Sequence, residues 1–162
     1  AGTYRLPEAQ LDRFLMKTSI GYPGREAGID VILGSAAPDR TRPLSPVIST
    51  KAVADMADLA ANNYVDRSIA AYVQDLCEAS RADSEVRIGV STRGAIAMMR
   101  AARVWAIAQG RNFVIPDDVQ ALAVRVWAPR LVLDPDAEFG GATREGVIER
   151  ALGAVAAPVM KG

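Results

Sequence analysis

Apolar residues with the 3.6-residue period of the α-helix dominate the middle and the second half of this chain. The clearest stripe follows Asp66 and comprises Ile69, Tyr72, Val73, Leu76 and Cys77. Residues three and four positions apart lie on one face of a helix, so this stripe predicts a helix with a buried side. Asp66 is suited to cap it. We therefore expect Cys77 to be a core residue rather than a reactive thiol.

The same period, together with capping and breaking residues, predicts a chain of helices. Helices are expected over 7–13 and 25–33, from Ser49 or Thr50 onward, from Asp66 onward, over 91–109, over 116–126 and over 143–156, with extended segments at 14–20, 86–88 and 112–115. Gly110 is a natural stop for the longest helix, which Ser91 would cap. Loops are expected at 34–48 and 134–141, which are rich in Gly, Pro and Asp. The predicted fold is mainly α, a helical bundle preceded by a short helix and strand.

Composition excludes several classes of function. Lys+Arg and Asp+Glu both number 19, so the chain lacks the basic excess of a dedicated nucleic-acid binder. With no histidine and one cysteine, the usual zinc sites, the Ser/His/Asp and Cys/His triads and an internal disulfide are excluded. No apolar run approaches the ~20 residues that span a bilayer. We expect no metal site, no membrane span and a cytoplasmic location. No G-x-x-x-x-G-K-[ST] phosphate loop is present either.

Arg93 occupies an unusual position if Ser91 caps the longest helix. It would lie in the first turn, where the helix dipole already presents positive charge, so an anion nearby would favour it. Arg100 lies seven residues on, on nearly the same face, and Arg103 is adjacent to that face. The alternative is a solvated arginine face that covers apolar neighbours.

Arg13 is less informative on residue chemistry alone. A cation at the end of a short helix complements the dipole, and Asp12 or Glu8 could pair with it at the surface. Asp117 and Asp118 are suited to capping a helix, and 134–136 to a turn. No pair of acidic residues stands out as a metal or acid/base site.

Several short motifs stand out along the chain. The first is LPEAQLDRF at 6–14, followed by SIGYP at 19–23. The second is STRGA at 91–95, followed by RAAR at 100–103, and GRNFVIPDDV at 110–119 and RLVL at 130–133 come later. Together these motifs resemble the MoxR family of AAA+ ATPases over most of the chain, and STRGA with RAAR resembles the lid motif of that family. The family usually has proline where Thr92 stands, and residues 35–46 match only as a variable connection.

The resemblance implies two domains: residues 1–23 as the C-terminal edge of an α/β ATPase core, and 24–162 as the helical lid. A hinge would lie at 21–24, and the Walker A, Walker B and sensor-1 motifs would lie upstream of Ala1. By resemblance Arg13 is an arginine finger acting on a neighbouring subunit, and Arg93 is a sensor-2 arginine. The residues implied to contact nucleotide are Arg93, Gly94, Tyr22, Pro23 and Ile29.

The resemblance also implies the function of an intact parent protein. That parent would bind ATP and Mg²⁺, form a ring, expected to be a hexamer, and remodel a client or assist its metal insertion or maturation. The client could carry a von Willebrand factor A domain, and no nucleic acid is expected. The fragment alone would neither bind these cofactors nor catalyse hydrolysis.

Two alternatives stay open at the level of sequence. The first is a helical nucleic-acid-binding module that uses the face of Arg93, Arg100 and Arg103. The second is a passive interaction domain in which Met98, Met99 and Trp105 dock a partner, although a core position is the simpler expectation for these side chains.

Overall fold

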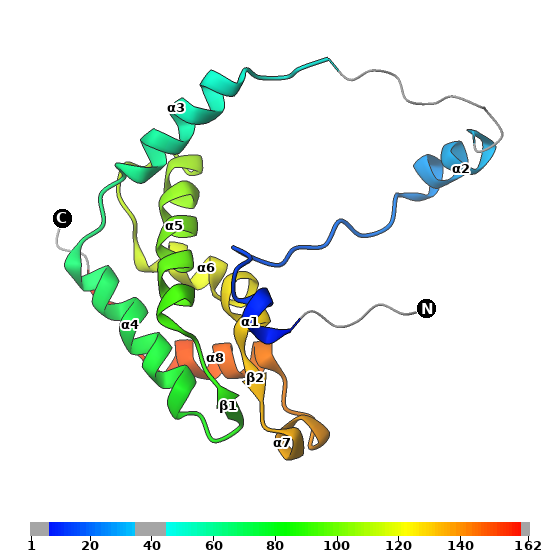
Figure 1. The fold of residues 1–162 in the computed structure, drawn as a ribbon. Helices are drawn as coiled ribbons and strands as arrows, with labels where there is room; N and C mark the ends of the chain where they lie inside the picture. The colour runs from blue at the N-terminus through cyan, green and yellow to red at the C-terminus, as the bar shows by residue number, and fades with distance from the viewer. Residues whose placement is uncertain (1–6, 35–44, 160–162) are drawn as a thin grey trace.

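The computed structural model describes residues 7–34 and 45–159 (Figure 1). Its helices in chain order are α1 (Glu8–Leu11), α2 (Arg25–Gly34), α3 (Thr50–Ala61), α4 (Arg67–Ala82), α5 (Thr92–Ala108), α6 (Pro116–Trp127), α7 (Pro135–Phe139) and α8 (Arg144–Ala154). A 3₁₀ turn, η1 (Ala128–Arg130), extends α6. The strands are β1 (Val86–Ile88) and β2 (Val132–Leu133). The predicted mainly helical fold is confirmed.

A helical bundle contains the core. Helix α5 packs on α6 and on α3, while α4 and α8 close the opposite side of the bundle. The stripe predicted on α4 faces inward, and Cys77 is 1% exposed. Trp127 is also buried, and its indole N–H donates to the backbone carbonyl of Gly94 at 3.1 Å, so the bulky side chain leaves no unpaired polar group. Apolar burial therefore holds α4, α5, α6 and α8 together.

The predicted helix starts are confirmed by their caps. The side chains of Ser49, Asp66 and Ser91 each accept a hydrogen bond from a backbone N–H in the first turn of α3, α4 and α5. Gly110 follows the end of α5 with φ of 76°, a conformation that glycine adopts without a steric penalty. Local capping chemistry thus determines where the bundle helices begin and end.

Two small β pairings connect segments that lie between the helices. Strands β1 and β2 pair antiparallel, with Val86 opposite Leu133. The segment predicted as extended at 112–115 contributes one bridge, between Tyr64 and Phe113. The predicted loop at 134–141 instead holds the short helix α7, with Asp134 as its N-cap. The predicted loop at 34–48 lies largely outside the described residues, which omit 35–44.

The N-terminal region differs from the sequence prediction in two ways. Helix α1 ends at Leu11 and passes into turns at 12–13, and residues 14–20 form no strand. A strand needs a neighbour to pair its backbone groups, and the one backbone hydrogen bond recorded for this segment outside the turn runs from the Lys17 N–H to the Arg125 carbonyl, 3.0 Å. Helix α2 lies apart from the bundle (Figure 1). Within the described parts of the chain, every helix is too short or too polar to cross a membrane.

Candidate functional site

An arginine-rich groove lies between the N-terminal segment and the bundle. It has a volume of about 480 Å³ and is lined by residues 12–15, by Arg93, Ile96, Ala97 and Arg100 of α5, and by Arg130. The two arginines singled out from the sequence, Arg13 and Arg93, are thus brought to one groove although they are far apart in the chain. A groove lined by several guanidinium groups is a candidate site for a polyanion.

Arg93 lies in the first turn of α5, as the sequence predicts. Ser91 precedes the helix and accepts a hydrogen bond from the Gly94 N–H at 3.1 Å. The Arg93 side chain is exposed, and it makes no ion pair or hydrogen bond with any residue that the structure describes. The positive end of the helix dipole and the Arg93 guanidinium therefore present positive charge at the same end of the groove.

Arg13 lies in the turn after α1. Its side chain is exposed, and neither Asp12 nor any other described residue pairs with it. The surface pair considered from the sequence is absent because Asp12 is engaged by Arg130 instead. Arg13 therefore remains available to an anion from outside the chain.

Arg100 and Arg103 separate on the surface of α5. Arg100 lines the groove and is exposed. Arg103 turns to the other side, where it donates a hydrogen bond to the Ala61 carbonyl at the end of α3, 3.0 Å away. The continuous basic face of Arg93, Arg100 and Arg103 expected for a nucleic-acid-binding module is therefore interrupted.

The apolar residues considered for partner docking belong mainly to the bundle. Met98 is fully buried and Met99 packs partly against the core, while Trp105 is 38% exposed. The simpler expectation of core packing is confirmed for Met98, and it removes the centre of the proposed docking surface.

Arg130 is the charged site residue that the sequence analysis did not single out, and Asp12 was considered there as a partner of Arg13 rather than of Arg130. The side chain of Arg130 is 3% exposed, and its Nε donates to Asp12 Oδ1 at 3.1 Å. Burial lowers the pKa of the Arg130 guanidinium, and the neighbouring Asp12 carboxylate opposes that shift. A lone arginine between Ala128 and the apolar run Leu131–Leu133 is a sequence signal for a buried ion pair, because such charges are rarely buried unpaired.

Gly94 has a packing role beside the groove. A Cβ atom there would lie 2.7 Å from Val90 Cγ1 and 3.1 Å from Arg130 Cδ. The missing side chain therefore leaves room for the stem of Arg130 to cross the start of α5. The resemblance implied a nucleotide contact at Gly94, and the structure adds this packing requirement.

Tyr22, Pro23 and Ile29 do not line the arginine-rich groove. Tyr22 and Pro23 are exposed in the segment between residue 20 and α2, and Ile29 is half-buried on α2. The described chain therefore brings together the arginines of the predicted site, while Tyr22, Pro23 and Ile29, also implied to contact nucleotide, lie elsewhere.

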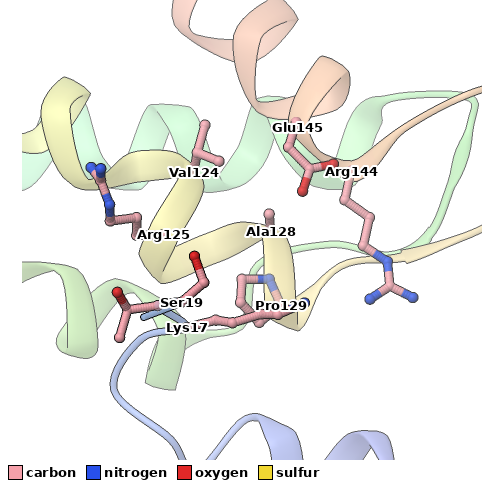
Figure 2. A pocket seen from close by; sticks show the side chains of 9 residues that line it. Lys17, Ser19, Val124, Arg125, Ala128, Pro129, Arg144 and Glu145 are labelled. Atoms are coloured by element: carbon pink, nitrogen blue, oxygen red, sulfur yellow. The ribbon is translucent and has the colours of Figure 1, made fainter. Parts of the chain in front are cut away.

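A second pocket is less suited to binding an anion. It has a volume of about 340 Å³ and lies where residues 17–19 meet the end of α6 and the start of α8. Figure 2 shows Arg125 and Arg144 extending toward opposite sides of this pocket, with the Glu145 carboxylate between them. Its two arginines do not converge, so we regard the arginine-rich groove as the candidate site.

The remaining buried ion pair near α6 is structural. Arg111 donates to both carboxylate oxygens of Asp118, at 2.8 and 2.5 Å, and Asp118 also accepts from the Ile115 N–H at 2.9 Å. Asp118 therefore supplies an acid in the first turn of α6, as expected, whereas the N-cap itself is Ile115 rather than an aspartate. Among the residues described, no group of three His, Cys, Asp or Glu side chains could hold a metal ion.

Comparisons with known proteins identify relatives of this fold. A family model described as the AAA lid domain matches residues 78–159. The chain is 38% identical over 160 residues to "Uncharacterized protein YeaC" of Bacillus subtilis, covering 99% of this chain and 50% of that protein. It is 36% identical over 168 residues to "Chaperone MoxR1" of Mycobacterium tuberculosis, covering 97% of this chain and 44% of that protein.

A solved structure has the same arrangement. The crystal structure of a "putative ATPase" from Cytophaga hutchinsonii superposes with a TM-score of 0.84 at 27% identity, covering 98% of this chain and 51% of that chain. The chain thus spans about half the length of the curated relatives that it matches. Since that superposition covers nearly the whole chain, it includes the segment that carries Arg13.

Proposed function

Because this chain belongs to the AAA lid domain family and is homologous to the MoxR chaperones, we propose that it serves as the lid of a MoxR-type AAA+ ATPase. In this proposal it couples ATP binding and hydrolysis in a longer parent protein to the remodelling, metal insertion or maturation of a client. Residues 1–23 would be the edge of the ATPase core and residues 24–162 the lid. The parent would form a ring, and its client could carry a von Willebrand factor A domain.

The observation that supports this function best is the shared groove of Arg13, Arg93 and Arg100. Three guanidinium groups without a partner among the described residues line it, while the one carboxylate present, on Asp12, is already paired with Arg130. Like charges repel, so a groove of this kind is stabilised when an anion enters it. A triphosphate has the charge that these three groups require.

The residues of this chain would act by positioning and by charge. ATP with Mg²⁺, when bound, would supply the phosphoryl group that is transferred, and catalysis of that transfer consists mainly of positioning and of stabilising the charge on the phosphate oxygens. Arg93 offers a rigid, permanently charged fork from the first turn of α5, and Arg13 offers another from the turn after α1. We assign no Mg²⁺ ligand to this chain.

Substitutions in the full-length protein test this assignment. Arg13→Ala is expected to lower the rate of ATP hydrolysis about 10³- to 10⁵-fold, the usual effect of losing an arginine finger. Arg93→Ala should also remove most activity. A matched control is Arg67→Ala, since Arg67 is an exposed arginine at the start of α4, away from the groove.

The thermal unfolding of each variant should match that of the wild type, because neither Arg13 nor Arg93 makes a recorded contact that holds the bundle together. Near-normal hydrolysis by either folded variant would reject the role of that arginine. The 162-residue chain alone holds no phosphate loop and should not hydrolyse ATP. If the purified chain hydrolysed ATP, the proposal that the rest of the parent protein supplies the catalytic core would be contradicted.

A further inference from the structure

Arg130 joins two parts of the chain that are far apart in sequence. Its Nε donates to Asp12 Oδ1 at 3.1 Å, and Nη1 donates to the Leu15 carbonyl, also at 3.1 Å. Nη2 donates to the Phe14 carbonyl, and Nη1 also donates to the Val126 carbonyl at the end of α6. One buried guanidinium therefore attaches the Asp12 side chain and the backbone at Phe14 and Leu15, on either side of Arg13, to the bundle.

Asp12 extends this connection to the helix that carries Arg93. The Ser91 hydroxyl donates to Asp12 Oδ2 at 3.1 Å and accepts from the Gly94 N–H. Asp12 thus contacts both Arg130 and the N-cap of α5. We call Arg130, Asp12 and Ser91 the arginine clasp.

The residues of the clasp are close in sequence to the two groove arginines. Arg13 follows Asp12 in the chain, and Arg93 is two residues after Ser91. The segment at 14–20 forms no strand and is exposed, so apolar packing does little to hold Arg13 in place. The polar contacts of the clasp hold this region instead: Arg130 binds the carbonyls of Phe14 and Leu15, and Asp12 binds Ser91 at the start of α5.

We infer that Arg130 is a positioning residue, which holds Arg13 and Arg93 in a fixed relation so that both reach one polyphosphate. The inference rests on the proposed function. Phosphoryl-transfer sites act through precise placement of charge, and a misplacement of about 1 Å can cost roughly 100-fold in rate. Loosening the clasp should therefore slow hydrolysis even though Arg13 and Arg93 remain present.

Two substitutions in the full-length protein loosen the clasp mildly. Arg130→Lys keeps a buried cation but loses the fork that reaches several acceptors at once. Asp12→Asn keeps the shape of the side chain and removes its charge, and it touches no part of the apolar core. The matched control is Arg111→Lys, which weakens another buried arginine–aspartate pair away from the groove.

Steady-state kinetics distinguish positioning from general stability. Asp12→Asn and Arg130→Lys should each lower kcat at least about tenfold while KM for ATP changes less than about threefold, because the bulk of nucleotide binding lies elsewhere. Arg111→Lys should lose comparable thermal stability and keep its kcat. If Asp12→Asn keeps normal kcat, or if Arg111→Lys loses kcat equally, the inference is overturned.

Hydrogen exchange provides a readout that does not depend on activity. In both clasp variants the hydrogen-bonded backbone amides of Arg13, Phe14 and Lys17 should exchange at least about tenfold faster, while those of α4 and α6 stay protected. Unchanged exchange at these three amides would overturn the inference. The two proposals also fail separately: full activity of Arg13→Ala and Arg93→Ala rejects the proposed function, whereas loss in those variants with normal kcat in Asp12→Asn rejects the clasp alone.

Discussion

Two arginines in this molecule have the same charge and opposite surroundings. Arg130 is almost fully buried, where a charge is costly unless it is paired and hydrogen-bonded, and it has a carboxylate and several carbonyl oxygens around it. Arg93 lies exposed at a helix start, where the dipole is unfavourable to a cation by about 0.3–1 kcal/mol. The first residue organises the molecule internally, whereas the second is suited to meet an anion from outside.

Cys77 gives a prediction that depends on pH. Burial raises the pKa of its thiol to about 11, with Arg81 opposing the shift. Above pH ~9 the unfolded chain releases the thiol proton while the folded chain keeps it, so stability falls as the pH rises toward 11. Between pH 8 and 10.5 the wild type should lose about 2 kcal/mol more free energy of unfolding in urea than Cys77→Ala. An equal loss in both proteins would show that the thiol is not shielded.

Gly94 gives a prediction about packing. Gly94→Ala adds a Cβ atom against Val90 and the stem of Arg130, and overpacking of this kind costs about 1–3 kcal/mol. The gain in helix propensity is about 1 kcal/mol, so a net loss of stability is expected. Gly153→Ala in α8 is the control, since nothing lies within 4 Å of the new atom. Thermal melts should show a lower Tm for Gly94→Ala only. If Gly94→Ala melted at the same temperature as the wild type, Val90 and Arg130 would be able to move aside at little cost in free energy.

At the scale of the elements, the loop between α5 and α6 depends on one ion pair. Asp118 is 2% exposed, and Arg111→Ala would leave its carboxylate with the Ile115 N–H as its remaining recorded partner. We expect a loss of about 2–4 kcal/mol in the free energy of unfolding. Arg25→Ala is the contrast, because Arg25 and Glu26 are both 83% exposed and such pairs contribute at most about 1 kcal/mol. Similar losses in the two variants would contradict this distinction between buried and exposed pairs.

The elements also show what local sequence can predict. The caps at Ser49, Asp66 and Ser91 were predictable because each acts on its own first turn. Helix α7 was missed since a five-residue helix has too few positions to show a period. The strand expected at 14–20 was wrong, because strand formation depends on a pairing partner that a local pattern does not contain.

The candidate site was predictable only in part, because local sequence identifies single residues but not the contacts between distant ones. Arg93 stands out through its cap, and Arg13 through its motif, but nothing local to either indicates that they share a groove. Arg130 contacts Asp12 across 118 residues of sequence, and such a contact follows only from the folded bundle. The resemblance therefore identified the arginines, and the structure supplied the geometry that connects them.

On the scale of the whole molecule, the groove assembles residues from three separate parts of the chain. The N-terminal segment contributes Arg13, the start of α5 contributes Arg93, and the end of α6 with η1 contributes the anchor Arg130. Arg13 or Arg93 alone would be an ordinary surface arginine, whereas Arg130 is buried. If the parent forms the proposed ring, their meeting in one subunit predicts that Arg13 and Arg93 serve the same nucleotide.

Mixing full-length variants tests that implication. If Arg13 and Arg93 act together on a nucleotide held by a neighbouring subunit, a mixture of inactive Arg13→Ala and Arg93→Ala subunits should stay inactive, because every groove lacks one arginine. If the two arginines served different nucleotides, some neighbouring pairs of subunits would together supply one intact Arg13 and one intact Arg93 to the same nucleotide. After random mixing in equal amounts, about a quarter of the interfaces of the ring would have this arrangement and regain activity. ATP hydrolysis measured after subunit exchange decides between these outcomes, with exchange verified by fluorescence transfer between labelled subunits. Restored hydrolysis would mean that Arg13 and Arg93 of one subunit do not act on the same nucleotide.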